Sequence, residues 1–161
     1  METVAAQPVV DVRPVTIDDV ELICRHREEM FRDTGDDEAT LRVMTEHFRT
    51  WLEPRLADGS YLGYILSSDG EVAGGVGLML IDWPPHPRHP NTDKRGYVLN
   101  LYVEPVYRRR GLARRLMQLA EDGLAKRGAT LLILHATDKA RPLYSQLGWV
   151  AGSAEMIKQL L

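Results

Sequence analysis

The chain has 161 residues, of which 44% are apolar and 27% charged, and its formal net charge is −3. These values are typical of one globular domain with a single core, and the acidic balance argues against a general nucleic-acid binder, which needs a basic excess. The single cysteine, Cys24, excludes an internal disulfide and a cysteine-based zinc cluster, and no apolar run approaches the ~20 residues that span a bilayer.

Residues 1–10 carry no basic stretch ahead of an apolar one, so we expect no signal peptide. We therefore expect a cytoplasmic protein without a membrane partner. No internal repeat or low-complexity tract divides the chain. We predict one domain over residues 1–161, with residues 1–8 as a flexible N-terminal segment.

The first part of the chain predicts one strand followed by two helices. Residues 9–15 are extended, with Pro8 and Pro14 restricting their ends. Thr16 then caps a helix that continues to Gly35. A second helix is predicted over residues 37–56, where apolar residues recur at helical spacing.

The next part of the chain has the period of strands. Residues 61–67 and 71–83 predict two strands, joined by a hairpin turn at Asp69-Gly70. The proline-rich residues 84–91 predict an exposed loop, and the apolar residues 97–103 predict a strand at the centre of a sheet. His86 and His89 in the loop have no third ligand nearby, so we expect no metal site.

The last third of the chain alternates helix and strand. Residues 111–127 predict an amphipathic helix, 130–135 a strand, 139–147 a short helix and 149–161 a last strand. This order predicts a mixed α/β sheet with helices on its faces. An exposed last strand would also allow pairing with a second copy, as a homodimer.

A basic turn joins the central strand to the long helix. A strand, a glycine-containing turn and a helix start form an anion site, because free backbone N–H groups and the helix dipole face outward there. Cations at a helix start are normally unfavourable, by ~0.3–1 kcal/mol each. Five arginines here therefore indicate a ligand with several negative charges, unless this is a solvated basic helix start: Arg108, Arg109, Arg110, Arg114 and Arg115.

The turn resembles a known motif. Arg108-x-x-Gly111-x-Ala113 follows an apolar strand and Val103-x-Pro105, and it is similar to the Q/R-x-x-G-x-G/A signature of the GNAT superfamily of N-acetyltransferases. Residues 140–149, with the sequence ARPLYSQLGW, resemble a second motif of that family. The resemblance implies the family's fold, a single-domain mixed and mostly antiparallel twisted sheet flanked by helices.

The resemblance also implies acetyl-CoA as the acyl donor. Backbone groups of the central strand, at Leu101, Tyr102 and Val103, would pair with its pantetheine arm. Backbone N–H groups of the signature would hold its pyrophosphate. The residues of that segment are Arg108, Arg109, Arg110, Gly111, Leu112, Ala113 and Arg114.

Acetyl transfer to an amine needs one group that takes the proton of the amine and one that protonates the departing thiolate. Tyr144 stands where the resembling family commonly places its general acid; the alternative is a tyrosine packed under a helix. For the base we rank Glu104, after the central strand, and His135, at the end of the next strand, first. A water chain stays open, as do three further carboxylates: Glu28, Glu29 and Asp82.

The acceptor pocket is expected between the end of the first helix, the proline-rich loop and the central strand. The residues predicted to line it are Met30, Phe31, Trp83 and Asn100, although Asn100 alternatively satisfies a buried partner. The absence of a long acidic run argues against a polycation and leaves a small amine, an amino-acid derivative or a peptide amine. We predict N-acetyl transfer, with a non-catalytic acyl-CoA sensor as the alternative and nucleic-acid binding as a poor third.

Overall fold

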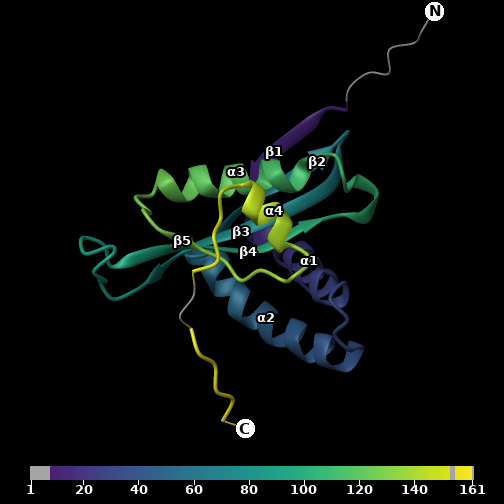
Figure 1. The fold of residues 1–161 in the computed structure, drawn as a ribbon. Helices are drawn as coiled ribbons and strands as arrows, with labels where there is room; N and C mark the ends of the chain where they lie inside the picture. Colours follow the sequence, from purple (N-terminus) through teal and green to yellow (C-terminus); the bar gives the residue numbers. More distant parts are fainter. Residues whose placement is uncertain (1–7, 153–154, 161) are drawn as a thin grey trace, which may run out of the picture.

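The computed structural model describes residues 8–152 and 155–160. Its sheet has five strands in the order β1-β2-β3-β4-β5 (Figure 1). Strands β1 to β4 pair antiparallel with their neighbours, and β5 runs parallel to β4. The predicted mixed, mostly antiparallel sheet is therefore confirmed. The strands are β1 (Val10–Pro14), β2 (Leu62–Ser68), β3 (Glu71–Asp82), β4 (Lys94–Val103) and β5 (Leu132–Ile133).

Two layers of helix cover the sheet. α1 (Val20–Arg32) and α2 (Glu38–Asp58) lie on one face, and α3 (Leu112–Ala125) lies on the other (Figure 1). The apolar stripe of α3 packs with β2, β3 and β4 into one core, whereas α1, α2 and Tyr61, which directly precedes β2, form a second core. The short helix α4 (Arg141–Gln146) packs on the α3 side. None of the helices in the described residues is both long and apolar enough to cross a membrane.

The hairpin between β2 and β3 turns at the predicted Asp69-Gly70. Both residues have positive φ angles, 50° and 85°. A two-residue turn of this type matches the right-handed twist of the strands that it joins. β2 pairs with β3 over its whole length, with one register shift between Leu66 and Ser67, and β3 continues beyond this pairing after Leu78.

Strand β4 carries a bulge at Asn100. Leu99 pairs with Gly77 and Tyr102 with Gly75, so β4 has one residue more than β3 between these pairs. Asn100 takes up the extra length with a φ of 55°, in the left-handed region that asparagine tolerates better than most residues. The bulge places the side chain of Tyr102 on the α1 face, against His26.

The pairing of β5 with β4 is short. It comprises two residue pairs, Gly96 with Leu132 and Tyr97 with Ile133. Within the described residues, no strand pairs with β4 on that side from residue 98 to residue 103. The strand predicted over residues 130–135 is thus reduced to its middle, because the chain leaves β4 after Ile133.

The C-terminal strand predicted over residues 149–161 is wrong for the part that the structure describes. Residues 149–152 and 155–160 have no regular structure, and Met156 and Ile157 are about nine-tenths exposed, at 94% and 87%. Apolar residues predict a strand only when a neighbouring strand is free to pair with them. Without this strand, the argument for pairing with a second copy no longer holds, and the homodimer stays a prediction. The N-terminal segment predicted as flexible lies outside the described residues, apart from Pro8.

Candidate functional site

The start of α3 presents free backbone donors. Gly111 is its N-cap with a φ of 76°, and no side chain caps the helix. The first bond of the helix runs from the amide of Arg115 to the carbonyl of Gly111, at 3.1 Å. The amides of Leu112, Ala113 and Arg114 therefore have no acceptor within the helix. The turn that leads to them, from Arg109 to Gly111, is exposed, whereas the side chain of Leu112 is buried. This geometry is that of an anion-binding helix start.

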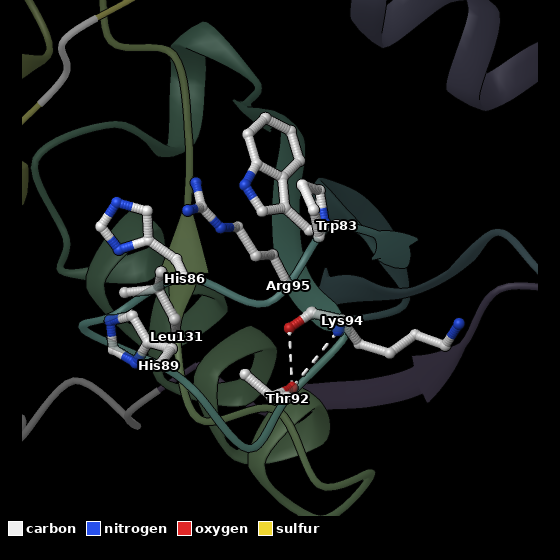
Figure 2. Close-up of a pocket in the computed structure, with 8 residues that line it drawn as sticks. Trp83, His86, His89, Thr92, Lys94, Arg95 and Leu131 are labelled. Atoms are coloured by element: carbon white, nitrogen blue, oxygen red, sulfur yellow. Dashed lines mark hydrogen bonds between the residues drawn. The ribbon is translucent and has the colours of Figure 1, made fainter.

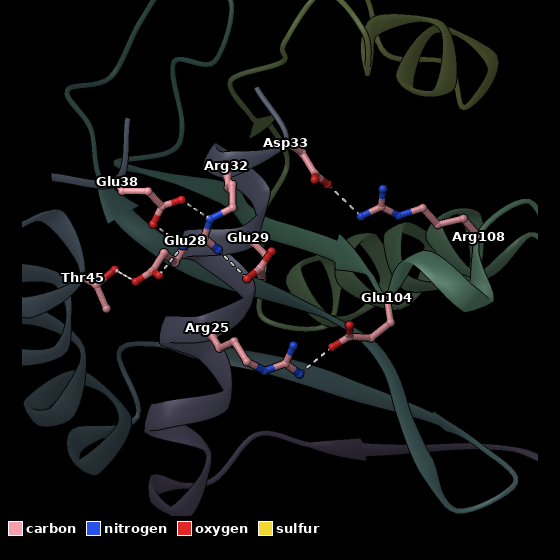
Figure 3. Close-up of polar contacts among 9 residues, drawn as sticks. All are labelled: Arg25, Glu28, Glu29, Arg32, Asp33, Glu38, Thr45, Glu104 and Arg108. Carbon is pink, nitrogen blue, oxygen red and sulfur yellow. Dashed lines mark hydrogen bonds and ion pairs between the residues drawn. The ribbon is translucent and has the colours of Figure 1, made fainter. Parts of the chain in front are cut away.

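The arginine side chains of the turn are only partly free. Arg108 donates to the carbonyl of Val103 and to Asp33, both at 2.8 Å, and its guanidinium lies 5.3 Å from the ring of Tyr102. It ties the end of α1 to the end of β4 (Figure 3). The guanidinium of Arg110 lies over the ring of Tyr107.

The remaining arginines of the turn are exposed. Arg109 has a φ of 63°, which is unusual for a residue with a side chain, and Arg114 makes one long contact of 3.4 Å with Gln146. A strained arginine two residues before Gly111 is the kind of backbone outlier that clusters at ligand sites. The backbone of the turn, more than its side chains, is shaped for an anion.

The open edge of β4 lies next to this turn. Leu101, Tyr102 and Val103 end the strand on the side from which β5 has departed. Gly74 on β3 permits the close packing of this end: a Cβ added there would lie 2.5 Å from the carbonyl oxygen of Tyr102. The unpaired edge and the uncapped helix start lie on either side of the turn of residues 104–111, although the carbonyl of Val103 already accepts from Arg108. A molecule with an amide-containing arm and a phosphate group would satisfy both.

Glu104 lies in a cluster of charged groups at the end of β4. Its carboxylate accepts from Arg25 at 2.5 Å and lies 3.2 Å from Nε2 of His26 (Figure 3). Burial alone would raise the pKa of Glu104, but the ion pair with Arg25 outweighs it and lowers the pKa. Burial, with Arg25 beside it, lowers the pKa of His26, so the imidazole is neutral near pH 7.

His26 was missed in the sequence. Its ring is buried, 2% exposed, and lies 5.0 Å from the ring of Tyr102. A Cβ on Gly75 would approach Nδ1 of His26 to 3.4 Å, so the glycines of β3 admit this ring against the sheet. The available signal was a histidine one turn after Ile23 on the apolar face of α1.

Glu28 and Glu29, the alternative carboxylates on α1, are engaged elsewhere. Glu28 accepts from Arg32 at 2.7 Å and from Thr45 at 2.6 Å, and Glu29 also accepts from Arg32. Arg32 binds Glu38 as well, so one guanidinium holds three carboxylates together at the α1–α2 junction (Figure 3). The third alternative, Asp82, is paired with Lys94 at the opposite end of β3.

Tyr144 lies on the α3 face of the sheet, in α4. Its ring is 6.4 Å from that of Trp149, and its hydroxyl has no hydrogen-bond partner within the described residues. Burial raises the pKa of Tyr144, so the phenol stays protonated at neutral pH. Glu104, by contrast, reaches Arg25 and His26 on the α1 face.

His135 and Glu104 are not brought together. His135 is exposed, and its Nδ1 lies 3.1 Å from the hydroxyl of Tyr97, near the start of β4. Tyr97 and Glu104 are seven residues apart, roughly 20 Å along a strand. The two predicted bases therefore belong to opposite ends of β4.

Trp83 is likewise separated from the other residues predicted for the acceptor. It lies at the loop end of the β3–β4 hairpin, where Arg95 stacks on its ring at 4.2 Å and His86 and His89 line a small pocket (Figure 2). Met30 and Phe31 lie in the last turn of α1, and the ion pair of Asp33 with Arg108 holds the end of this helix near the opposite end of β4. The described residues contain no group of three or more potential metal ligands.

Arg27 of α1 links Asn100 of β4 to Phe31. The carbonyl oxygen of Asn100 accepts from Arg27 at 2.7 Å, and its amide donates to the hydroxyl of Tyr61 at 3.0 Å. The guanidinium of Arg27 lies 5.0 Å from the ring of Phe31. Burial raises the pKa of Tyr61 to about 12.

Comparison with known proteins identifies the same architecture. Residues 21–149 match the model of the acetyltransferase (GNAT) family. A GCN5-related N-acetyltransferase from Ralstonia eutropha JMP134 is 52% identical, with a TM-score of 0.91 over 94% of this chain and 99% of that one. A comparison with curated proteins gives no match.

More distant structures share the fold. A predicted acetyltransferase from Clostridium acetobutylicum, solved with acetyl-CoA, has 20% identity and a TM-score of 0.84 over 94% of this chain and 97% of that one. A ribosomal-protein-alanine N-acetyltransferase from Brucella melitensis biovar Abortus 2308 has 20% identity and a TM-score of 0.68, over 94% and 99%.

Proposed function

Because the chain belongs to the GNAT family of acetyltransferases, we propose that it transfers an acetyl group from acetyl-CoA to a primary amine of a small molecule or peptide. The observation that carries this proposal is the uncapped start of α3 beside the open edge of β4. The similar protein from Clostridium acetobutylicum was solved with acetyl-CoA, which supports this donor.

The donor is placed by backbone groups in this proposal. The amides of Leu112, Ala113 and Arg114 hold the pyrophosphate, since they are free and lie at the positive end of the helix dipole. Arg109 and Arg110 add positive charge on the outside of the turn. The edge of β4 from Leu101 to Val103 pairs with the amide-containing arm, which brings the thioester next to this edge.

The reaction requires a base on one side of the thioester and an acid on the other. As the amine nitrogen bonds to the acetyl carbon, its proton passes to Glu104, directly or through water, and the C–S bond breaks. Tyr144 then donates its phenolic proton to the departing thiolate, and the phenolate takes a proton back from solvent. Because a phenol has a higher pKa (~10) than a thiol (~8.5), this proton transfer is uphill, and the breaking of the C–S bond drives it. The two side chains lie toward opposite faces of the sheet.

Arg25 and His26 position Glu104 in this scheme. Their contacts fix its carboxylate and keep it ionised at neutral pH, although the lowered pKa also makes Glu104 a weaker base. His135 has no such place, because it lies near the start of β4, beside Tyr97. We therefore assign the base to Glu104 rather than to His135.

Release of free coenzyme A tests the proposal. Purified protein is mixed with acetyl-CoA and a panel of primary amines, and the free thiol and the acetylated amine are both measured. Calorimetry measures coenzyme A binding in parallel. Amine-dependent release of thiol with matching amounts of acetylated product is the expected result. Tight binding without release for every amine would favour the acyl-CoA sensor, and absence of binding would refute both.

A further inference from the structure

Arg27 is a partly buried cation without a carboxylate partner in the described part of the chain. Its Nη1 donates to Asn100, and its guanidinium lies 5.0 Å and 4.7 Å from the rings of Phe31 and Phe48. Its Nε is sealed from solvent and bonds to no group in residues 8–152 and 155–160. Burial lowers the pKa of Arg27, and no charged carboxylate offsets that burial.

The other arginines of α1 show what Arg27 lacks. Arg25 reaches Glu104, and Arg32 holds three carboxylates, Glu28, Glu29 and Glu38. These carboxylates already have ion-pair partners at the edge of α1, whereas the side chain of Arg27 points inward to β4. Because a guanidinium stays charged in proteins, Arg27 cannot lose its proton to relieve the burial.

The contacts of Arg27 compensate its charge only in part. Two ring faces and one amide oxygen attract a cation, but none of them carries a negative charge. Holding a desolvated ion without a counterion lowers the stability of the fold, and an apolar side chain in the same place would avoid that cost. A permanent cation held in this way by two rings and an asparagine is suited to receive an anion from outside the chain.

Arg27 is also correctly located for the reacting molecule. Asn100, its hydrogen-bond partner, directly precedes Leu101, where the edge of β4 assigned to the donor begins. Tyr97 and Tyr61 are close enough to Arg27 to interact with its charge. An anion at Arg27 would therefore lie on the α1 face of β4, next to the proposed position of the thioester.

We infer that Arg27 binds a negatively charged group of the acceptor, a carboxylate or a phosphate, so that the substrates are amines that also carry an anion. This inference rests on the proposed acetyl transfer. The planar guanidinium matches the oxygens of both groups and can donate two parallel hydrogen bonds. The acidic side chains of α1 do not point to a cationic acceptor instead, because Glu28 and Glu29 are already engaged by Arg32.

Matched pairs of acceptors test the inference. Each amino acid of a panel is compared with its C-terminal amide, which keeps the amine and removes the negative charge. O-phosphoethanolamine is compared with ethanolamine in the same way, so that the two arms distinguish carboxylate from phosphate. Values of kcat/KM are referred to the concentration of unprotonated amine, because the pKa of the amine differs within a pair.

The anionic member of at least one pair should be preferred by tenfold or more. Arg27→Met should reduce that preference to less than about twofold and leave the KM for acetyl-CoA unchanged, whereas Arg27→Lys should retain part of it. Arg49→Met is the control, because Arg49 pairs with Glu21 on the outer side of the same helix pair and its loss should not change the preference.

Three results would overturn the inference. If the unaltered protein uses both members of every pair equally well, anion binding is refuted while acetyl transfer stands. If the preference for the anionic member persists in Arg27→Met, anion binding by Arg27 is refuted in the same way. If no amine is acetylated although coenzyme A binds, acetyl transfer itself is wrong and the inference falls with it. Should Arg27→Met not fold, Asn100→Asp provides the second variant, since it neutralises Arg27 from within the site.

Discussion

Replacing Asn100 by aspartate would give Arg27 the counterion that the described chain lacks. The carbonyl oxygen of Asn100 lies 2.7 Å from Nη1 of Arg27, so a carboxylate in its place would form a close ion pair. Aspartate has the same shape as asparagine and tolerates the left-handed backbone, here with a φ of 55°. The hydroxyl of Tyr61, which now accepts from Asn100, can rotate its hydrogen to donate to the carboxylate. We therefore expect Asn100→Asp to fold.

The size of the effect follows from the charges. In the variant, the anion of an acceptor at Arg27 would face the new carboxylate across one guanidinium, at roughly 6 Å. Two unit charges at this distance repel by about 2.8 kcal/mol at an effective dielectric constant of about 20. That free energy corresponds to a factor of about one hundred in affinity. Neutral amines do not feel this repulsion.

Steady-state kinetics with matched acceptor pairs measure this effect. Asn100→Asp should raise the KM for the anionic acceptor about a hundredfold and leave the KM for its neutral counterpart and for acetyl-CoA within about threefold. Asn100→Ser is the control, because it shortens the side chain without adding a charge. Equal losses for charged and neutral acceptors in Asn100→Asp would refute the electrostatic reasoning and assign Asn100 a purely structural role.

The ion pair also predicts how the stability of Asn100→Asp depends on pH. Pairing with Arg27 lowers the pKa of the new carboxylate in the folded state. The stabilisation is therefore present above the unfolded pKa of about 3.9 and is lost as the pH falls through the folded value. Thermal unfolding followed by circular dichroism between pH 3 and pH 7 measures it against the unaltered protein.

Three further changes test other parts of the structure. Gly111→Leu and Gly59→Leu each force a side chain onto a left-handed backbone, with φ angles of 76° and 78° and no atom near the new Cβ. Both variants should lower the free energy of unfolding by about 1–2 kcal/mol, but only Gly111→Leu should weaken coenzyme A binding, measured by calorimetry. If both variants bind coenzyme A with equal affinity, the start of α3 is not the anion site. Tyr144→Phe should lower kcat about a hundredfold and leave the KM for acetyl-CoA unchanged. Because burial raises the pKa of Tyr144, the kcat of the unaltered enzyme should not fall through ionisation of this acid below about pH 10. Gly123→Ala brings a Cβ to 2.8 Å from the hydroxyl of Tyr64. The higher helix propensity of alanine should therefore raise the free energy of unfolding, by up to about 1 kcal/mol, only when Gly123→Ala is combined with Tyr64→Phe. An equal gain with and without Tyr64→Phe, measured by thermal unfolding, would show that the contact with the hydroxyl costs nothing.

The sequence predicted those parts of the fold that local rules determine. The order of helices and strands follows from periodicity, the β2–β3 turn from Asp69-Gly70, and the start of α3 from Gly111. Each of these features depends on residues that are close together in the chain. The bulge at Asn100 does not, because the pairing with β3 determines where the extra residue of β4 lies.

The candidate site was less predictable, since its contacts join distant parts of the chain. Glu104 and Arg25 are 79 residues apart, and Arg27 and Asn100 are 73 apart. Sequence alone placed Trp83 in the same pocket as Phe31, because both are apolar and lie near predicted ends of elements. The length of the β3–β4 hairpin separates them. The C-terminal strand failed for a related reason: alternation indicates which residues suit a strand, but it does not supply a partner.

The two-residue pairing of β5 with β4 has a consequence for folding stability as well as for binding. A donor that pairs with the free edge of β4 takes the place of a neighbouring strand, so it binds the native chain and not the unfolded one. Its concentration then enters the folding equilibrium: a hundredfold excess over its dissociation constant would add about 2.7 kcal/mol to the free energy of unfolding. In a cell, the supply of the acyl donor would thereby govern how much of this protein stays folded when heat or proteases challenge it.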